Sequence, residues 1–151
     1  ITPVFDREDL TSRIVLINVE YYFHRRLGLA SGVMDSLKTT VWNSRYLSRG
    51  SKIRVFRSLV MPVLLYSCET WTLTDKLKKR LNSFVTISLR RIFKYTWSDF
   101  VPNEVILRRA GMGKATCLIR ERQLRFYGHL ARFPRTILLI ASSRPRIRVI
   151  G

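Results

Sequence analysis

The sequence is poor in acidic residues, cysteines and histidines. Ten Asp and Glu residues stand against 28 Lys and Arg residues, which gives a net charge of +18. Because 46% of the residues are hydrophobic, we expect a folded chain whose first partner is nucleic acid and whose second candidate is an anionic membrane surface. The two cysteines, Cys68 and Cys117, form no CxxC pair, so we expect reduced thiols in an intracellular protein, nuclear or cytoplasmic.

Long hydrophobic runs are also missing. The longest uncharged run, residues 58–68, is well short of the roughly 18–20 residues that a spanning helix needs. The first residues, ITPVFDREDL, lack the basic-then-apolar pattern of a secretory signal. We therefore expect no segment that spans a membrane, and of the two candidate partners we expect nucleic acid and not a membrane. The chain begins at Ile rather than Met, which favours a piece of a longer protein.

The sequence offers no arrangement typical of a catalytic centre. Its adjacent acidic pair, Glu8 and Asp9, has no third acid nearby to help hold two cations. The stretch GMGKAT at 111–116 has the wrong spacing for a phosphate-binding loop. Neither His24 nor His129 stands at metal-ligand spacing from a cysteine. We expect no catalytic residue, no metal and no cofactor.

Hydrophobic periodicity predicts an all-α fold, a small bundle of about four to five helices. From residue 26, apolar residues recur every three or four positions up to about Trp42. A second helix is expected from about Lys52, capped by Ser48 or Ser51 and kinked at Pro62. Its broad apolar face comprises Ile53, Phe56, Leu59, Val60, Val63 and Leu64.

Three further helices follow in the prediction. Thr74 with Asp75 is the expected cap of a helix over 76–95, which carries one apolar face. Asn103 is the expected cap of a short helix that Gly111 stops. The last helix ends before Pro134.

The predicted organisation has four parts. Residues 1–25 form an irregular segment in which SRIVLINVEYYF suggests a strand. Residues 26–111 form the helical bundle, and 112–135 form a basic C-terminal helix or connector. Residues 136–151 form a flexible or truncated tail.

One segment carries a family resemblance. KIRVFRSLVMPVLLYSCETWTLT, residues 52–74, resembles a segment that follows the polymerase core in reverse transcriptases of LINE-type (non-LTR) retrotransposons. The family pattern P-x-L-L-Y-G-x-E-x-W is matched by Pro62, Leu64, Leu65, Tyr66, Glu69 and Trp71. Ser67 stands where the family usually has Gly.

Other blocks resemble the family in the same order. Residues 26–37 and 80–111 resemble the flanking segments. RERQLRFYGHLARFP, 120–134, is similar to the element R-R-L-r-w-x-G-H-x-x-R through Arg122, Leu124, Gly128, His129 and Arg132. The resemblance covers about residues 25–135.

The resemblance implies the thumb and the following connector of such an enzyme, without fingers, palm or polymerase aspartates. A thumb is a helical bundle that packs on the palm and lies along the template–primer minor groove. We therefore expect a non-catalytic fragment that binds an RNA–DNA hybrid or duplex through its backbone, independently of sequence. The missing palm and fingers are the other expected partner.

Ten basic residues are the predicted phosphate contacts, and seven residues are predicted to be structural. The contacts are Lys52, Arg54, Arg57, Arg90, Arg91, Lys94, Arg120, Arg122, Arg125 and Arg132. The structural residues are Pro62, Leu64, Leu65, Tyr66, Glu69, Trp71 and His129, with Tyr66 and Trp71 buried, Glu69 paired with an Arg or capping a helix, and His129 hydrogen-bonded in the core.

Two alternatives stay open. The bundle is a protein-interaction module if the missing acidic parts of a parent protein neutralise its charge. It is a helix-turn-helix DNA-binding domain if residues 102–129 read a defined site, although no short recognition helix with base-reading Asn or Gln stands out there.

Overall fold

The computed structural model describes residues 7–132, and their side chains from residue 18 onward. Six α-helices account for most of this range, and none of its residues forms a strand. The helices are α1 (Arg7–Ser36), α2 (Arg49–Val55), α3 (Met61–Leu64), α4 (Asp75–Phe93), α5 (Asn103–Ala110) and α6 (Ala115–Leu130). Short turns join them: π-helical η1 (Lys38–Trp42) and η2 (Phe56–Val60), and 3-10 helical η3 (Cys68–Thr70) and η4 (Trp97–Asp99). The predicted all-α bundle is confirmed.

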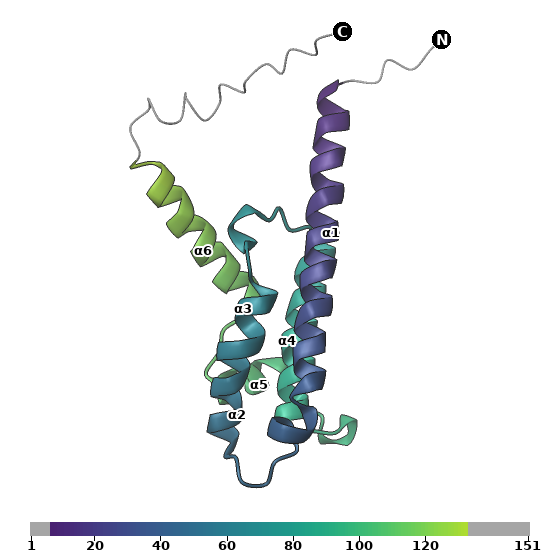
Figure 1. The fold of residues 1–151 in the computed structure, drawn as a ribbon, viewed down its shortest axis with the longest axis vertical. Helices are drawn as coiled ribbons and strands as arrows, with labels where there is room; N and C mark the ends of the chain where they lie inside the picture. The colour runs from purple at the N-terminus through teal and green to yellow at the C-terminus, as the bar shows by residue number, and fades with distance from the viewer. Residues whose placement is uncertain (1–6, 133–151) are drawn as a thin grey trace, which may run out of the picture.

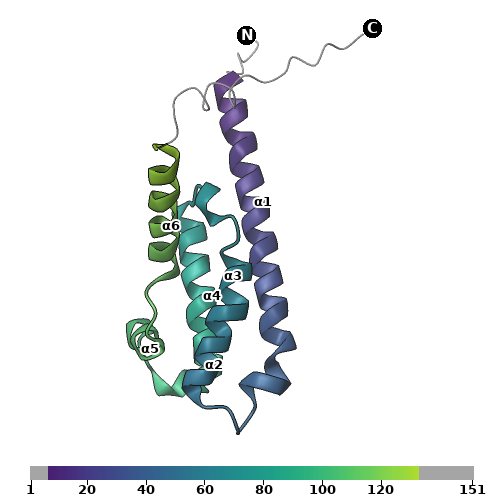
Figure 2. The ribbon, with the colours of Figure 1, turned by 60° about the vertical axis from the view of Figure 1, so that its left-hand side comes forward.

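The longest helix, α1, runs along the whole molecule (Figure 1). The α2–η2–α3 segment returns antiparallel to α1, and α4 then runs back beside both of them, as Figures 1 and 2 show together. α5 lies at the lower end, and α6 packs against α4 and η3. Side chains from all these elements fill one core, whose largest fully buried members include Phe23, Phe56, Leu64, Leu81, Leu89 and Ile106.

The predicted irregular segment at the N-terminus is wrong for the residues that the structure describes. α1 already begins at Arg7, so the expected strand lies inside a helix. Phe23 is fully buried and meets the Trp71 ring edge to face, with the ring centres 5.7 Å apart. Such tertiary packing overrides the local strand preference of β-branched residues. Residues 1–6 and the predicted tail at 136–151 lie outside the described residues.

Most predicted helix boundaries are confirmed. The Ser48 hydroxyl accepts a hydrogen bond from the backbone N–H of Ser51 at the start of α2, and Thr74 caps α4 in the same way. Gly111 ends α5 in the left-handed conformation, with φ of 59°. The predicted cap at Asn103 is wrong, because Asn103 is the first residue of α5 and Pro102 precedes it as the cap.

Pro62 distorts its helix by widening the turn before it. Proline has no N–H to donate, and its ring crowds the carbonyl one turn back. The chain forms the π-helical turn η2 just before Pro62. The backbone N–H of Met61, the residue after η2, donates a hydrogen bond to the carbonyl of Phe56, five residues earlier. Four of the six predicted apolar residues here are buried, but Leu59 is 48% exposed.

Among the helices of the described residues, none has both the length and the apolar character required to cross a bilayer.

Candidate nucleic-acid interface

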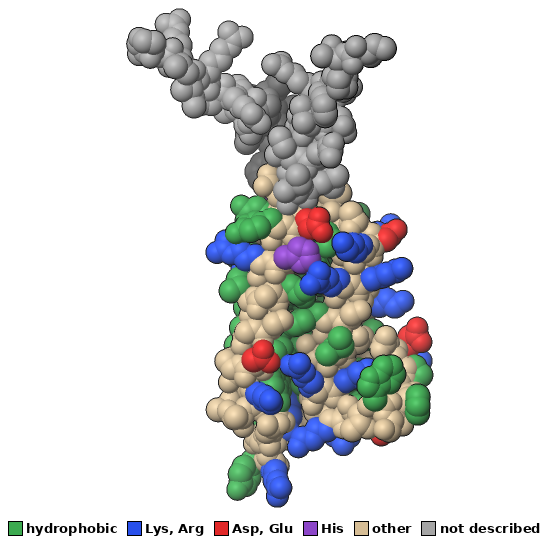
Figure 3. Space-filling model, turned by 90° about the vertical axis from the view of Figure 1, so that its right-hand side faces the viewer, with side chains coloured by type: hydrophobic (Ala, Val, Ile, Leu, Met, Phe, Trp, Pro, Cys, Tyr) green, Lys and Arg blue, Asp and Glu red, His purple; other side chains and the backbone are tan. Residues whose placement is uncertain are grey.

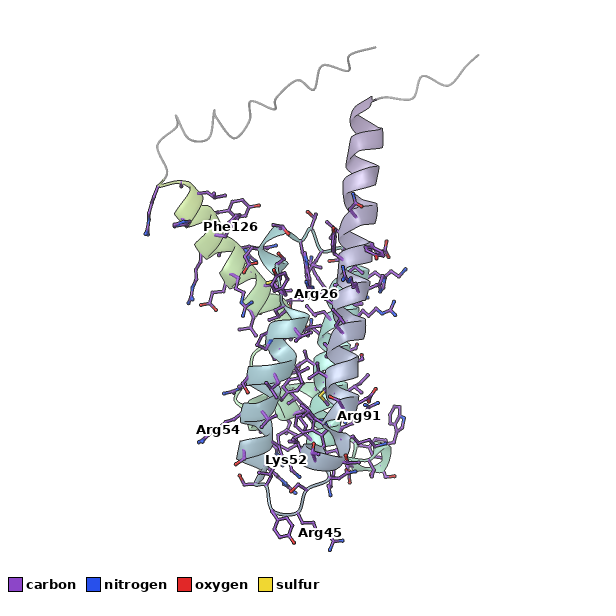
Figure 4. The ribbon with its side chains drawn as sticks, viewed as in Figure 1. Arg26, Arg45, Lys52, Arg54, Arg91 and Phe126 are labelled. Carbon is purple, nitrogen blue, oxygen red and sulfur yellow. The ribbon has the colours of Figure 1, made fainter. Side chains whose placement is uncertain are left out.

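Lys52 was predicted to contact phosphate, and the structure contradicts this. The Lys52 residue is only 5% exposed, and its ammonium donates hydrogen bonds to the carbonyls of Trp42 at 2.9 Å and Ser44 at 2.8 Å. Figure 4 shows Lys52 inside the lower end of the bundle. The lysine therefore joins α2 to the end of η1, and its charge does not reach the surface.

Three of the predicted arginines donate hydrogen bonds to main-chain carbonyls. Arg57 donates to the carbonyls of Ala110, at 2.6 Å, and Gly111, so it holds the end of α5 against η2. Arg90 donates to the carbonyl of Val101 at 2.6 Å. Arg122 donates to the carbonyl of Leu65 at 3.3 Å. These guanidinium groups fix the junctions between helices, since Arg57 and Arg122 bond carbonyls that helix ends leave open and Arg90 bonds a carbonyl of the loop before α5.

The other six predicted contacts are exposed, but they do not share one face. Arg91 pairs with Asp35, and Arg125 pairs with Glu121. The side chains of the remaining four make no hydrogen bond or ion pair with any described residue: Arg54, Lys94, Arg120 and Arg132. Figure 4 places Arg54 and Arg91 on opposite sides of the bundle. One duplex therefore does not contact all of them at once.

A more compact group of cations lies on α4. We define the basic stripe as Lys76, Lys79, Arg80, Arg91 and Lys94, all of which are exposed. At 3.6 residues per turn, the four within α4 fall in an arc of about 120° and extend over about 22 Å of helix axis, and Lys94 follows at the helix end. Figure 3 faces this side, where Lys and Arg side chains extend from the upper to the lower end of the bundle.

The predicted site residues include only two members of the basic stripe, Arg91 and Lys94. The other three members, Lys76, Lys79 and Arg80, could be found from the apolar repeat of the helix. The buried residues of α4 repeat at Leu77, Leu81, Val85 and Leu89, and the stripe occupies the opposite side of that helix.

The predicted structural residues divide into two groups. Leu64, Leu65 and Trp71 are buried, as expected, and the side chain of Gln123 in α6 donates to the Trp71 carbonyl at 2.7 Å. The prediction is wrong for Tyr66, which is 60% exposed and stacks against Arg26, whose guanidinium carbon lies 4.1 Å from the ring centre.

Three other structural predictions also fail. His129 is exposed on α6 rather than buried in the core, and Pro62 is exposed rather than part of the core, although it distorts its helix as predicted. Glu69 is half-buried in η3 and makes no hydrogen bond or ion pair with the described residues, so the expected arginine partner is absent among them.

The cysteines do not form a reactive centre. Cys68 is buried, and burial raises the pKa of its thiol above the ordinary value, with the Glu69 carboxylate raising it further. A thiol with a raised pKa carries little thiolate near neutral pH. Within residues 18–132 the structure brings together no group of three or more His, Cys, Asp or Glu side chains that could hold a metal ion.

No protein-family model, no curated protein and no solved structure matches this chain.

Proposed function

We propose that this chain is a non-catalytic helical bundle that binds an RNA–DNA hybrid or a duplex through the phosphate backbone, independently of sequence. The observation that carries the proposal is the basic stripe. The side chains of Lys76, Arg80 and Lys94 make no hydrogen bond or ion pair with any described residue, so their charges have no counterion in the described part of the chain.

A nucleic-acid duplex can supply the negative charges that the basic stripe needs. Double-stranded nucleic acid carries one negative charge per about 1.7 Å of its axis, so about 22 Å of stripe faces many phosphates. Contacts from lysine and arginine side chains to phosphate oxygens position a protein on the backbone and carry no sequence information.

The resemblance to the thumb of LINE-type reverse transcriptases adds to this proposal. Ser67 has φ of 59° and ψ of 21°, the left-handed conformation that glycine adopts freely. The family pattern has Gly at this position, so the backbone shape fits the pattern even though the side chain differs. We accordingly propose a fragment of a retrotransposon polymerase, acting inside the cell and without polymerase activity of its own.

The test is the salt dependence of binding to a labelled hybrid of about 20 base pairs. If all five stripe cations contact phosphates, the logarithm of the association constant falls with log salt at a slope of about −4 to −5. Binding that is unchanged from about 50 to 500 mM salt would contradict the proposal. So would a footprint confined to one sequence, or nucleotide addition by the purified chain alone.

A second candidate function is packing against the missing polymerase core. Tyr22 and Tyr66 are more than half exposed and line one pocket with Arg26, with a volume of about 300 Å³. Leu59 on η2 is also 48% exposed. This apolar surface fits a protein neighbour better than a phosphate backbone. Co-expression with an upstream palm domain should then raise the stability of the bundle, whereas free nucleic acid should not.

A further inference from the structure

The loop between α4 and α5 exposes two aromatic rings. Trp97 is 91% exposed and Phe100 is 83% exposed. The other two tryptophans of the sequence, Trp42 and Trp71, are 4% and 5% exposed. Figure 3 shows apolar side chains standing out from the lower right of the surface, beside Lys and Arg side chains. These two rings are among the most exposed aromatic side chains of the described residues, and burying each of them against a partner would be favourable.

Hydrogen bonds hold this loop in one conformation. The Asp99 carboxylate accepts hydrogen bonds from the backbone N–H of Thr96 at 2.6 Å and from its hydroxyl at 3.0 Å. Arg90 ties the far end of the loop, because it donates to Asn103 as well as to the Val101 carbonyl. Phe100 has φ of 43°, an unfavourable conformation for a bulky residue. Such strain persists only where its surroundings impose it.

The rings border a pocket that two arginines line, one of which, Arg91, forms the exposed ion pair with Asp35. The pocket has a volume of about 720 Å³, within the range of pockets that bind small organic groups. Arg90 and Arg91 line it with Trp97 and Phe100, and no Asp or Glu does. Arg91 also belongs to the basic stripe. The pocket therefore lies where a strand that follows the stripe would leave α4.

We propose that this loop is a stacking site for unpaired nucleobases at the lower end of the basic stripe. The occupant is a single-stranded extension of the bound duplex, whose bases stack on Trp97 and Phe100 while Arg91 and Lys94 neutralise its phosphates. Stacking on aromatic rings tolerates any base, because every base has a flat face. This inference rests on the proposed binding of nucleic acid, and it adds that the chain distinguishes paired from unpaired strands.

The experiment compares two labelled hybrids, one blunt and one with a single-stranded extension of about six thymidines. The wild-type chain should bind the extended hybrid about five- to a hundredfold more tightly than the blunt one. Trp97→Ala should abolish this preference and leave the affinity for the blunt hybrid unchanged. Trp97→Phe keeps a ring at the same position and should retain part of the preference.

Tryptophan fluorescence gives an independent measurement. Since Trp42 and Trp71 are buried, quenching by the extended hybrid should come from Trp97. It should therefore persist in Phe100→Ala, at lower affinity, and disappear in Trp97→Ala.

Three results would overturn the inference. If the wild-type chain binds both hybrids equally, the stacking site is wrong while the proposed duplex binding stands. If Trp97→Ala weakens binding of the blunt hybrid as much as binding of the extended one, Trp97 belongs to the duplex contact or to a surface with another role. If neither hybrid binds, the stacking site and the proposed function both fail.

Discussion

The cations at the helix junctions and the cations on the outer face of α4 are the same residue types in different physical situations. Lys52, Arg57 and Arg90 donate hydrogen bonds to main-chain carbonyls and hold separate segments together. The side chains of Lys76, Arg80 and Lys94 make no hydrogen bond or ion pair with the residues that the structure describes. The first set stabilises the fold, and the second set remains available for a partner.

This difference limits what a net charge can indicate. Each junction cation satisfies carbonyls that would otherwise lack a partner, so part of the surplus of +18 has a structural role. A polyanion can neutralise only the cations that stay exposed. Variants that remove one set but not the other should therefore separate stability from binding.

The largest effect on stability should come from Lys52→Met. This change keeps the apolar stem but leaves the carbonyls of Trp42 and Ser44 without their donor, so the free energy of unfolding should fall by about 2–3 kcal/mol. Urea denaturation measures it. The control is Arg54→Gln, two residues along and exposed, which should change stability by less than about 0.5 kcal/mol. Equal losses of unfolding free energy in the two variants would show that junction cations and exposed cations contribute alike to stability.

Adjacent arginines on α4 provide a second comparison. Arg90→Gln should reduce the free energy of unfolding by about 1–2 kcal/mol, because the Val101 carbonyl and the Asn103 side chain lose a charged donor. Arg91→Gln loses one exposed ion pair with Asp35, so its cost should be at most about 0.5 kcal/mol. Thermal unfolding of both variants tests the ranking, and a larger loss for Arg91→Gln would contradict it.

Arg57→Gln should lower the free energy of unfolding by about 1 kcal/mol, since it leaves the carbonyls of Ala110 and Gly111 at the end of α5 without their donor. The effect should be local. Hydrogen exchange should accelerate in α5 more than in α1, whereas uniform acceleration across both helices would mean that Arg57 has no specific role at this junction.

Removing the exposed set should affect stability least. The fourfold variant with Lys76, Arg80, Arg91 and Lys94 changed to Gln should unfold within about 1 kcal/mol of the wild-type chain, because these side chains are exposed and the loss of repulsion offsets the loss of the Asp35 pair. Circular dichroism during urea denaturation measures this. A large destabilisation would place the stripe among the structural cations.

Local sequence signals predicted the helices where a periodic apolar face coincided with a cap or a stop. The helix α4 has both, with Thr74 at its start and a regular buried repeat. Gly111 ends α5 for the same kind of local reason. The prediction for the N-terminal part of α1 is wrong. Its β-branched residues favour a strand locally, but they belong to the helix that places Phe23 in the core.

The roles of individual side chains depended on contacts between distant segments. Lys52 is buried because η1 brings the carbonyl of Trp42, ten residues earlier, within hydrogen-bond distance of the Lys52 ammonium. Tyr66 points outward while Leu64 and Leu65 are buried, since α3 ends at Leu64 and Ser67 then adopts a left-handed turn. No periodic pattern in the sequence encodes either arrangement.

The most direct test of the account is the salt dependence of hybrid binding by two charge-matched variants. One is the fourfold stripe variant, and the other changes four exposed cations away from the stripe to Gln: Arg45, Arg49, Arg108 and Lys114. We predict that the slope of log affinity against log salt falls from about −4.5 to about −1 in the stripe variant and stays near −4.5 in its match. Equal reductions in both variants would show that net charge alone binds nucleic acid, and would contradict a specific basic stripe on α4.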